Sequence, residues 1–240
     1  MDKDFLDFIN EVEIKRTEIK CSSSGAFFRG HENSSYQLTP SLLRKNISTN
    51  IEHNLYHECF VRANHLVNRN ANSWERLAFM QHYGIPTRLL DWTESLAVAL
   101  FFAVNDNSSN PHLWIINAFH LNKDSTKNSR IFVTGLDFIP EYYDSFVSIE
   151  NRHVWKYEKP IFLQIPWTMD RLKVQSGFFT FHSNEKPLEI TSQKYIRKVD
   201  IPINIIDNIF KFLSHAGITE YSVFPDFFGL ARFIYRRYNL

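Results

Sequence analysis

The sequence predicts an α+β protein whose central sheet is mixed, mostly antiparallel and flanked by helices. Short apolar runs of strand length are interspersed with longer segments of helical periodicity, without the regular rhythm of a parallel sheet. The chain has 240 residues, 44% hydrophobic and 15% aromatic, which is ample for one core. No segment argues for a boundary. We therefore expect one compact domain over residues 1–240, with a core at 24–235 and an N-terminal helix at 3–20 packed on it.

The N-terminal segment predicts one helix and one short strand. Phe5, Phe8 and Val12 recur at helical spacing, which indicates an amphipathic first helix. Residues 26–28 are apolar throughout and are typical of a buried strand, which we expect to end at Arg29.

Two further helices are predicted before the middle of the chain. The first is long and covers residues 51–71. The second covers 74–80, with Ser73 as its N-cap and without a strict capping box. Pro86 stops it, because proline has no amide hydrogen and biases the preceding residue toward extended geometry.

Residues 96–104 form an almost wholly apolar segment of helical length. Such a helix must be buried, because it has no polar face to turn to water. The preceding residues, 81–95, gather polar, aromatic and cationic side chains in a turn-rich segment. A polar segment on such a rigid support is a better place for a site than an arbitrary loop.

The second half of the chain is expected to contain both strands and helices. Its expected strands are 113–116, 161–165, 177–181 and 195–199. Its expected helices are 205–215 and 227–238, with a loop and a short helix between 117 and 130.

Charge and apolar content limit the partners. The net charge of +1 gives no global attraction to nucleic acid or to an anionic membrane, so such binding needs a local patch. No apolar run approaches the roughly 20 residues that span a bilayer. The first residues lack the pattern of a signal peptide. We expect a cytoplasmic protein without a membrane partner, and two free thiols at Cys21 and Cys59.

The ten histidines raise the possibility of a metal-dependent hydrolase. His53 and His57 are four residues apart on an expected helix and so share a face. A third ligand at metal-site spacing is missing, and His-Glu-x-x-His does not occur. We therefore expect no metal. A hydrolytic site would have to combine histidines from distant segments with one carboxylate: His31, Glu32, His53, His57 and His82.

Four blocks of characteristic residues stand in order along the chain. The first is Phe28-Arg29-Gly30 with His31, and the second is the segment 81–95. The third block consists of Arg171, Gln175, Gly177 and Phe179, and the fourth runs from Gly217 through Pro225-Asp226 to Leu230. Together these blocks resemble the FRG domain family, and the resemblance covers most of the chain.

At the level of fold, these blocks also resemble parts of NAD-dependent ADP-ribosyltransferases. In those enzymes an early strand ends in an aromatic-Arg-Gly element, a later one leads through Ser or Thr into a helix, and a last one carries a glutamate. Phe28-Arg29-Gly30 and Asp91-Trp92-Thr93-Glu94-Ser95 are similar to the first two, and Gln175 takes the position of the glutamate.

The resemblance implies roles for individual residues in NAD binding. Arg29 with Gly30 would hold the diphosphate, His31 and Tyr83 would border nicotinamide or ribose, and Gln175 would meet the ribose hydroxyls. Because an amide supplies no net charge, a carboxylate such as Asp91, Glu220 or Asp226 would have to stabilise positive charge on the ribose. The other residues expected at the site are Arg88, Trp92, Thr93 and Ser95.

The function implied is transfer of ADP-ribose from NAD to a macromolecule, either protein or nucleic acid. The setting would be a bacterial toxin or an anti-phage defence protein, with an antitoxin or a defence-system protein as partner. In this interpretation Arg29, Asp91 and Gln175 are the catalytic residues.

Two alternatives stay open. In one, Arg29, Asp91, Glu220 and Asp226 form a buried ion-pair network that fixes the fold. In the same interpretation Asp226, which follows Pro225, caps the next helix. In the other, the protein binds a nucleotide or nucleic acid without turnover. The nucleotide or nucleic acid would lie in a groove lined by basic and aromatic side chains: Arg29, Arg44, Lys45, Arg76, Arg88, Arg171, Lys173, Phe28, Tyr83 and Trp92.

Overall fold

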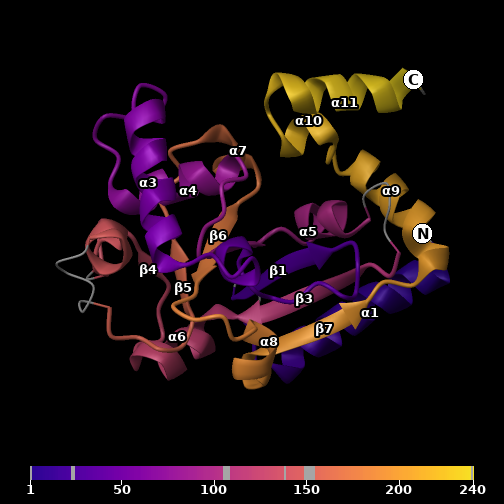
Figure 1. Cartoon of the computed structure of the whole chain (residues 1–240). Helices are drawn as coiled ribbons and strands as arrows, with labels where there is room; N and C mark the ends of the chain where they lie inside the picture. Colours follow the sequence, from indigo (N-terminus) through magenta and orange to yellow (C-terminus); the bar gives the residue numbers. More distant parts are fainter. Residues whose placement is uncertain (1, 23–24, 105–108, 138, 149–154, 239) are drawn as a thin grey trace.

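A seven-stranded sheet runs through the centre of the computed structural model, which describes residues 2–22, 25–104, 109–137, 139–148, 155–238 and 240 (Figure 1). The strand order is β4-β5-β6-β2-β1-β3-β7. The strands are β1 (Ala26–His31), β2 (Leu89–Thr93), β3 (His112–Asn117), β4 (Phe132–Val133), β5 (Ile161–Gln164), β6 (Gly177–Phe181) and β7 (Ile196–Asp200).

Only β4 and β5 pair in parallel among the described strands, and the other neighbours are antiparallel. The predicted α+β class with a mixed, mostly antiparallel sheet is therefore confirmed. Two strands escaped prediction. β4 has only two residues, and β2 lies inside the segment 81–95 that was expected to be turn-rich.

The two halves of the sheet are joined at a single point. β1 pairs with β3 at six positions and β2 pairs with β6 at five. Between β1 and β2 the register consists of one pair, Phe28 with Thr93. Because twisted strands with so little pairing diverge, the sheet opens next to this pair. Arg29 and Asp91 come from the two diverging strands.

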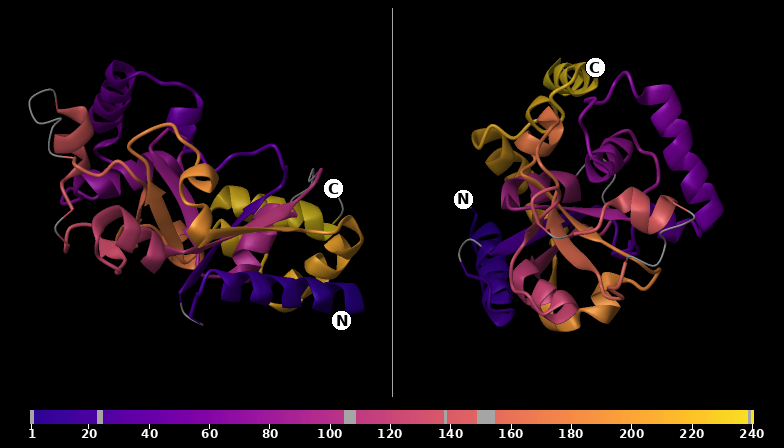
Figure 2. Two further views of the ribbon diagram at one scale, coloured as in Figure 1. Left: turned by 90° about the horizontal axis from the view of Figure 1, so that it is seen from below. Right: turned by 90° about the vertical axis from the view of Figure 1, so that its left-hand side faces the viewer.

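Helices cover both faces and both ends of the sheet (Figures 1 and 2). Their bounds are α1 (Lys3–Glu18), α2 (Ser41–Arg44), α3 (Thr49–Ala63), α4 (Ser73–His82), α5 (Leu96–Ala103), α6 (Ala118–Thr126), α7 (Asp170–Val174), α8 (Leu188–Thr191), α9 (Ile206–His215), α10 (Glu220–Val223) and α11 (Phe227–Tyr238). A π-helical turn (Tyr143–Val147) and two 3₁₀ turns (Gln193–Tyr195 and Ile203–Ile205) complete them.

The apolar helix α5 packs directly on β1, as its composition predicted. Val98, Ala99 and Leu100 are buried in a core that includes residues of α1 and α9. Gly30 lets the helix come this close, because a Cβ there would stand 1.9 Å from the carbonyl oxygen of Ala99. α5 thus fixes the position of β1 and of Arg29.

Two local predictions were wrong. The helix expected over 51–71 ends at Ala63, where Leu66 N–H donates to the Ala63 carbonyl and the chain turns. The N-cap of α4 is Asn72 and not Ser73: Asn72 and Glu75 form a full capping box. Ser73 instead donates to the carboxylate of Glu141.

Candidate functional site

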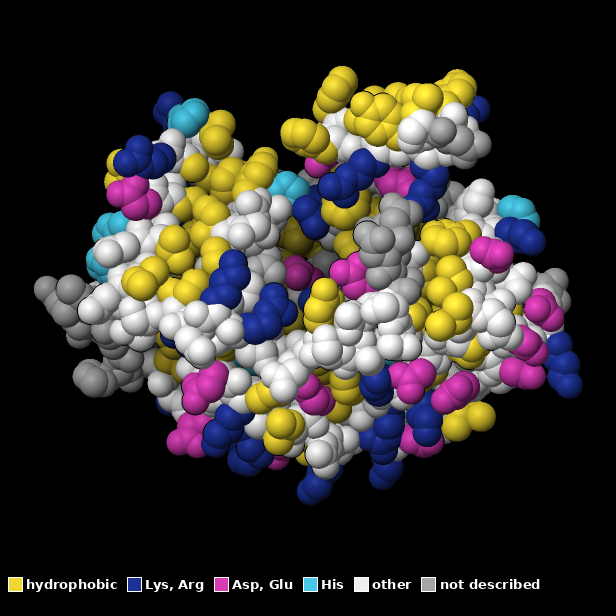
Figure 3. Space-filling view, turned by 45° about the vertical axis from the view of Figure 1, so that its right-hand side comes forward, with side chains coloured by type: hydrophobic (Ala, Val, Ile, Leu, Met, Phe, Trp, Pro, Cys, Tyr) yellow, Lys and Arg dark blue, Asp and Glu magenta, His cyan; other side chains and the backbone are white. Residues whose placement is uncertain are grey.

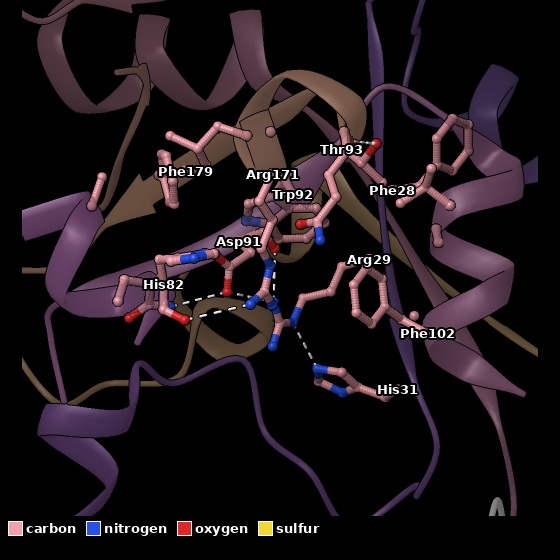
Figure 4. Close-up of a pocket in the computed structure, with 18 of the residues that line it drawn as sticks. Phe28, Arg29, His31, His82, Asp91, Trp92, Thr93, Phe102, Arg171 and Phe179 are labelled. Atoms are coloured by element: carbon pink, nitrogen blue, oxygen red, sulfur yellow. Dashed lines mark hydrogen bonds and ion pairs between the residues drawn. The ribbon is translucent and has the colours of Figure 1, made fainter. Parts of the chain in front are cut away.

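A pocket of about 350 Å³ lies where β1 and β2 diverge. Its walls come from β1, β2, β6, α4, α5 and α7, and its mouth is visible as a hollow below α11 (Figure 3). Figure 4 shows charged and aromatic side chains from these distant segments facing one space. The residues used below are Arg29, His31, Tyr36, Gln81, His82, Asp91, Trp92, Thr93, Phe102, Arg171 and Gln175.

Arg29 points into the pocket and is fixed by two neighbours (Figure 4). Its Nε donates to Nε2 of His31 at 2.8 Å, and its Nη1 donates to the Asp91 carbonyl at 2.8 Å. The Asp91 carboxylate lies 3.6 Å from Nη1. Burial lowers the pKa of Arg29, and the charge of Asp91 opposes this. A guanidinium remains protonated in such a site, so Arg29 supplies a preoriented cation.

His31 is neutral in this arrangement. Burial, the Arg29 guanidinium and His112 lower its pKa to about 2. Because Nε2 accepts the hydrogen bond from Arg29, the ring proton is on Nδ1. The ring of His112 lies 5.2 Å away, edge to face. His31 therefore orients Arg29 without adding charge to the pocket.

The carboxylate of Asp91 is held at the pocket by Gln81. Nε2 of Gln81 donates to Oδ2 of Asp91 at 3.0 Å, and the hydroxyl of Thr87 donates to Oε1 of Gln81. The Asp91 side chain remains 54% exposed. Together the two groups can bind a ligand of mixed charge: the carboxylate contacts its cationic part and the guanidinium contacts its anionic part.

Thr93 and Gln175 connect β2 to the segment before β6. Oγ1 of Thr93 donates to the Gln175 carbonyl at 2.6 Å and accepts from the N–H of Ser95 at 3.0 Å. Nε2 of Gln175 donates to the Val223 carbonyl at 2.9 Å, which ties α10 to the pocket wall. Ser95 caps α5 through Val98 N–H. Gln175 thus makes a structural hydrogen bond in addition to any contact with a ligand.

A second guanidinium, Arg171, lines the pocket, although the sequence analysis placed it only in a possible nucleotide- or nucleic-acid-binding groove and not among the NAD-binding residues. Its Cζ lies 4.6 Å from the ring centre of Phe224, and Nη1 is 3.4 Å from the His82 carbonyl. Burial lowers its pKa, while Asp91 and Asp226 oppose that shift. The spacing of Arg171 and Gln175, four residues apart along α7 and its C-cap, could have indicated a shared face.

Arg88, expected among the NAD-binding residues, does not line the pocket. It forms a buried bidentate pair with Glu52 on α3, with both N–O distances at 2.6 Å. Burial alone would lower its pKa, but the hydrogen bonds and charge of Glu52 hold the pKa above its ordinary value. Tyr142 also donates to Glu52. Glu52 lies 36 positions from Arg88, and no local pattern connects the two residues. The structural role of Arg88 could therefore not be predicted from the sequence.

Of the other residues that were expected at the site, some line the pocket and others lie outside it. Trp92 lines the pocket but is nearly fully buried, with Nε1 donating to Thr180 at 3.1 Å. Tyr83 is 65% exposed, lies outside the lining and meets the His82 ring edge to face. Asp226 caps α11 by accepting from Gly229 N–H at 2.8 Å, as its position after proline predicted. Glu220 pairs with Arg236 at 2.9 Å, so the four-residue network does not form.

The histidine pair on α3 stacks with ring centres 4.3 Å apart, consistent with the shared face. Within the described ranges, no cluster of three or more His, Cys, Asp or Glu side chains could hold a metal. The same ranges contain no helix with the length and apolarity needed to cross a bilayer. Cys21 and Cys59 are free thiols whose pKa is raised by burial.

The fold and the pocket define an α+β protein with a cation-lined cavity at a split in its sheet. Residues 24–112 match the family model of the FRG domain, the family that the sequence blocks resemble. The match includes Arg29, Asp91 and Thr93, whereas Arg171 and Gln175 lie beyond it. No curated protein and no solved structure matches the chain.

Proposed function

We propose that the pocket binds NAD and that the protein transfers ADP-ribose from it to a macromolecule. The observation that carries this proposal is the convergence of Arg29, Arg171 and Asp91 on one aromatic-walled cavity. Two guanidiniums suit a diphosphate, because each can donate two hydrogen bonds to phosphate oxygens. Phe102, which is partly exposed in the same cavity, offers a ring face to nicotinamide or adenine.

The three elements that resemble ADP-ribosyltransferases border one pocket. Arg29 is on β1, Thr93 ends β2 just before α5, and Gln175 precedes β6. This arrangement supports the resemblance stated from the sequence. The proposal for Arg29 is that it clamps diphosphate, with Arg171 as its second cation.

The reaction needs stabilisation of positive charge on the ribose. The bond from the ribose anomeric carbon to the nicotinamide nitrogen breaks, and its electron pair leaves with nicotinamide. An oxygen or nitrogen of the acceptor forms the new bond to this carbon and releases a proton to water. Asp91 is the carboxylate placed to stabilise the charge that develops on the ribose, because it is fixed and faces the pocket. Gln175 would accept from a ribose hydroxyl through Oε1.

Binding is tested with Arg29→Ala, using calorimetric titration of NAD. We expect the dissociation constant to rise about 10- to 100-fold, since a charge-assisted hydrogen bond contributes about 1.5–3 kcal/mol. Arg29→Lys should fall between, because it keeps the charge but loses the fork. Arg62→Ala is the matched control: Arg62 is exposed and pairs with Glu58 on α3. Equal affinity in wild type and Arg29→Ala would contradict the proposal.

Turnover is tested by measuring free nicotinamide and by mass spectrometry of adducts after incubation with NAD and cell lysate. Asp91→Asn should lower the rate about 100-fold or more, with a much smaller effect on NAD affinity. The toxin or defence role is a separate part of the proposal. It predicts that growth inhibition on expression disappears in both Arg29→Ala and Gln175→Ala.

A binding module without turnover is the second candidate. It is favoured by Gln175, whose amide has no charge and already donates to the Val223 carbonyl. Its signature would be NAD or nucleotide binding that depends on Arg29, with neither free nicotinamide nor adducts.

A further inference from the structure

Positive charge extends from the pocket to both of its flanks. Burial lowers the pKa of Arg29, and the charge of Arg44 on α2 lowers it further. Burial likewise lowers the pKa of Arg171, and Arg232 on α11 adds to that shift. Arg44 and Arg232 are both exposed. In the space-filling view, Lys and Arg side chains accordingly gather on two sides of the central hollow (Figure 3).

The first turn of α11 lies close to the pocket. Phe224, just before α11, packs against the Arg171 guanidinium, and the neighbouring Val223 carbonyl accepts from Gln175. The charge of Asp226 acts on both Arg171 and His82. The beginning of α11 is therefore continuous with the pocket rim.

Exposed aromatic side chains accompany the cations on both flanks. Tyr36, which lines the pocket on the β1 side, is 44% exposed. Phe227 and Phe228 in the first turn of α11 are 82% and 81% exposed. Guanidiniums interleaved with accessible rings are the chemistry that binds single-stranded nucleic acid, because phosphates pair with the cations and bases stack on the rings.

Glu32, which lines the pocket, accepts a hydrogen bond from the Tyr36 hydroxyl at 3.3 Å, and two other carboxylates along this path also have partners. Asp91 lies beside Arg29 and accepts from Gln81, and Asp226 accepts from the N–H of Gly229. Their repulsion of a phosphate backbone is therefore partly offset by these contacts. The exposed cations Arg44 and Arg232 lie outside the pairs.

We propose that the macromolecular acceptor is a single-stranded nucleic acid that crosses the pocket mouth from α2 to α11, which rests on the proposed ADP-ribose transfer. Its phosphates contact Arg44 and Arg232, and its bases stack on Tyr36 and on Phe227 or Phe228. The nucleotide between these contacts presents its base or sugar to the pocket. A duplex does not serve, because its bases are stacked and paired away from such a mouth.

The test measures fluorescence anisotropy of labelled DNA and RNA single strands of about 12 nucleotides, which is within the usual site size. Affinity should fall with added salt. Arg44→Ala and Arg232→Ala should each flatten the slope of log K against log salt by about 0.7, the contribution of one phosphate contact. The double variant Phe227→Ala with Phe228→Ala should weaken binding about fivefold or more.

Lys123→Ala is the control, because Lys123 is exposed on α6 and lies outside the pocket lining. It should leave oligonucleotide affinity unchanged. NAD affinity should be the same in these four variants as in the wild type, since the changed side chains do not line the pocket. Circular dichroism confirms the fold of each variant.

Three results would overturn the proposal. The first is no single-strand binding by the wild type, and the second is an equal loss in Lys123→Ala and Arg232→Ala. The third is tighter binding of duplex than of single strand. NAD binding with adducts on proteins but not on nucleic acid would leave ADP-ribose transfer in place and refute this acceptor. Salt-dependent oligonucleotide binding without NAD binding would support nucleic-acid binding at this surface and refute the transfer of ADP-ribose.

Discussion

Arg88 and Arg29 show how differently two similar residues can be used. Arg29 lies within β1 and Arg88 directly precedes β2, and both were expected to contact an anion. Arg88 is sealed against Glu52 in the core, whereas Arg29 reaches the pocket with only part of its fork engaged. The difference is the position of the nearest carboxylate: Glu52 is buried, and Asp91 is more than half exposed.

The Arg88 pair predicts a large effect of removing one charge. In Glu52→Gln the guanidinium stays buried without its counter-ion, so the free energy of unfolding should fall by about 3 kcal/mol or more. Glu58→Gln, on the same helix, removes the exposed partner of Arg62 and should cost about 0.5 kcal/mol or less. Urea denaturation measures both. Similar losses in the two variants would show that the buried pair has no special weight.

Three buried histidines predict a loss of stability in mild acid. Burial lowers the pKa of His31 to about 2, of His112 to about 4 and of His182 to about 3, against an ordinary value of 6.5. Between pH 6.5 and about 4 the unfolded chain therefore binds protons that the folded chain does not. Their contribution is fully present above pH 6.5 and falls by up to about 1.4 kcal/mol per pH unit for each histidine.

Urea denaturation at pH 7, 6 and 5 measures this slope. His182→Gln should flatten it by up to about 1.4 kcal/mol per pH unit, whatever it does to stability at pH 7. His215→Gln changes an exposed histidine at the end of α9 and should leave the slope as it is. A wild-type stability that does not change from pH 7 to pH 5 would contradict neutral burial of these rings.

At the scale of elements, α5 and β1 form the unit on which the site is built. The sequence predicted that 96–104 is buried, because its residues leave no polar face, and the structure bears this out for Val98 and Leu100. It did not predict that Gly30 serves this contact: the notional Cβ would meet the backbone of Ala99 and Ala103. The sequence analysis expected Gly30 to contact NAD, whereas the structure shows that it allows α5 to pack closely on β1.

The contact predicts that Gly30→Ala is severely destabilising. Its Cβ would lie 1.9 Å from the Ala99 carbonyl oxygen and 2.7 Å from the Ala103 nitrogen, so α5 or β1 must move. We expect a loss of about 3 kcal/mol or more in the free energy of unfolding. Gly84→Ala is the comparison, because it has a φ of +79° and no atom within 4 Å of the added carbon. Thermal melting should show a loss of about 1 kcal/mol there.

Sequence reasoning found elements better than it found contacts between them. Long periodic segments gave α1, α9 and α11, the almost wholly apolar segment gave α5, and shorter apolar runs gave five of the strands. β2 was missed because its five residues do not alternate regularly between apolar and polar and lie in a segment rich in turn formers. Arg171 was expected in a possible nucleotide- or nucleic-acid-binding groove but not among the NAD-binding residues, because only the fold brings α7 to the same cavity as β1.

At the scale of the whole molecule, the pocket depends on two bodies meeting across a weak junction. The two halves of the sheet share the pair Phe28 with Thr93, and the C-terminal helices rest on the side of α7. The amide of Gln175 is therefore a link between the sheet and the arm formed by α10 and α11. Motion of this arm would widen or narrow the mouth, because Phe224 on the arm packs against Arg171 on α7.

This link predicts a local effect of Gln175→Ala. The loss of its hydrogen bond to the Val223 carbonyl removes about 1 kcal/mol from the docking of α10, so amides of α10 and α11 should exchange about fivefold faster. Amides of β3, in the middle of the other half of the sheet, should keep their protection. Hydrogen exchange with mass spectrometry separates the two regions, and Gln193→Ala, at an exposed 3₁₀ turn, serves as control. Equal acceleration in β3 and α10 would mean that Gln175 stabilises the whole fold, and the arm could not then move independently of the sheet.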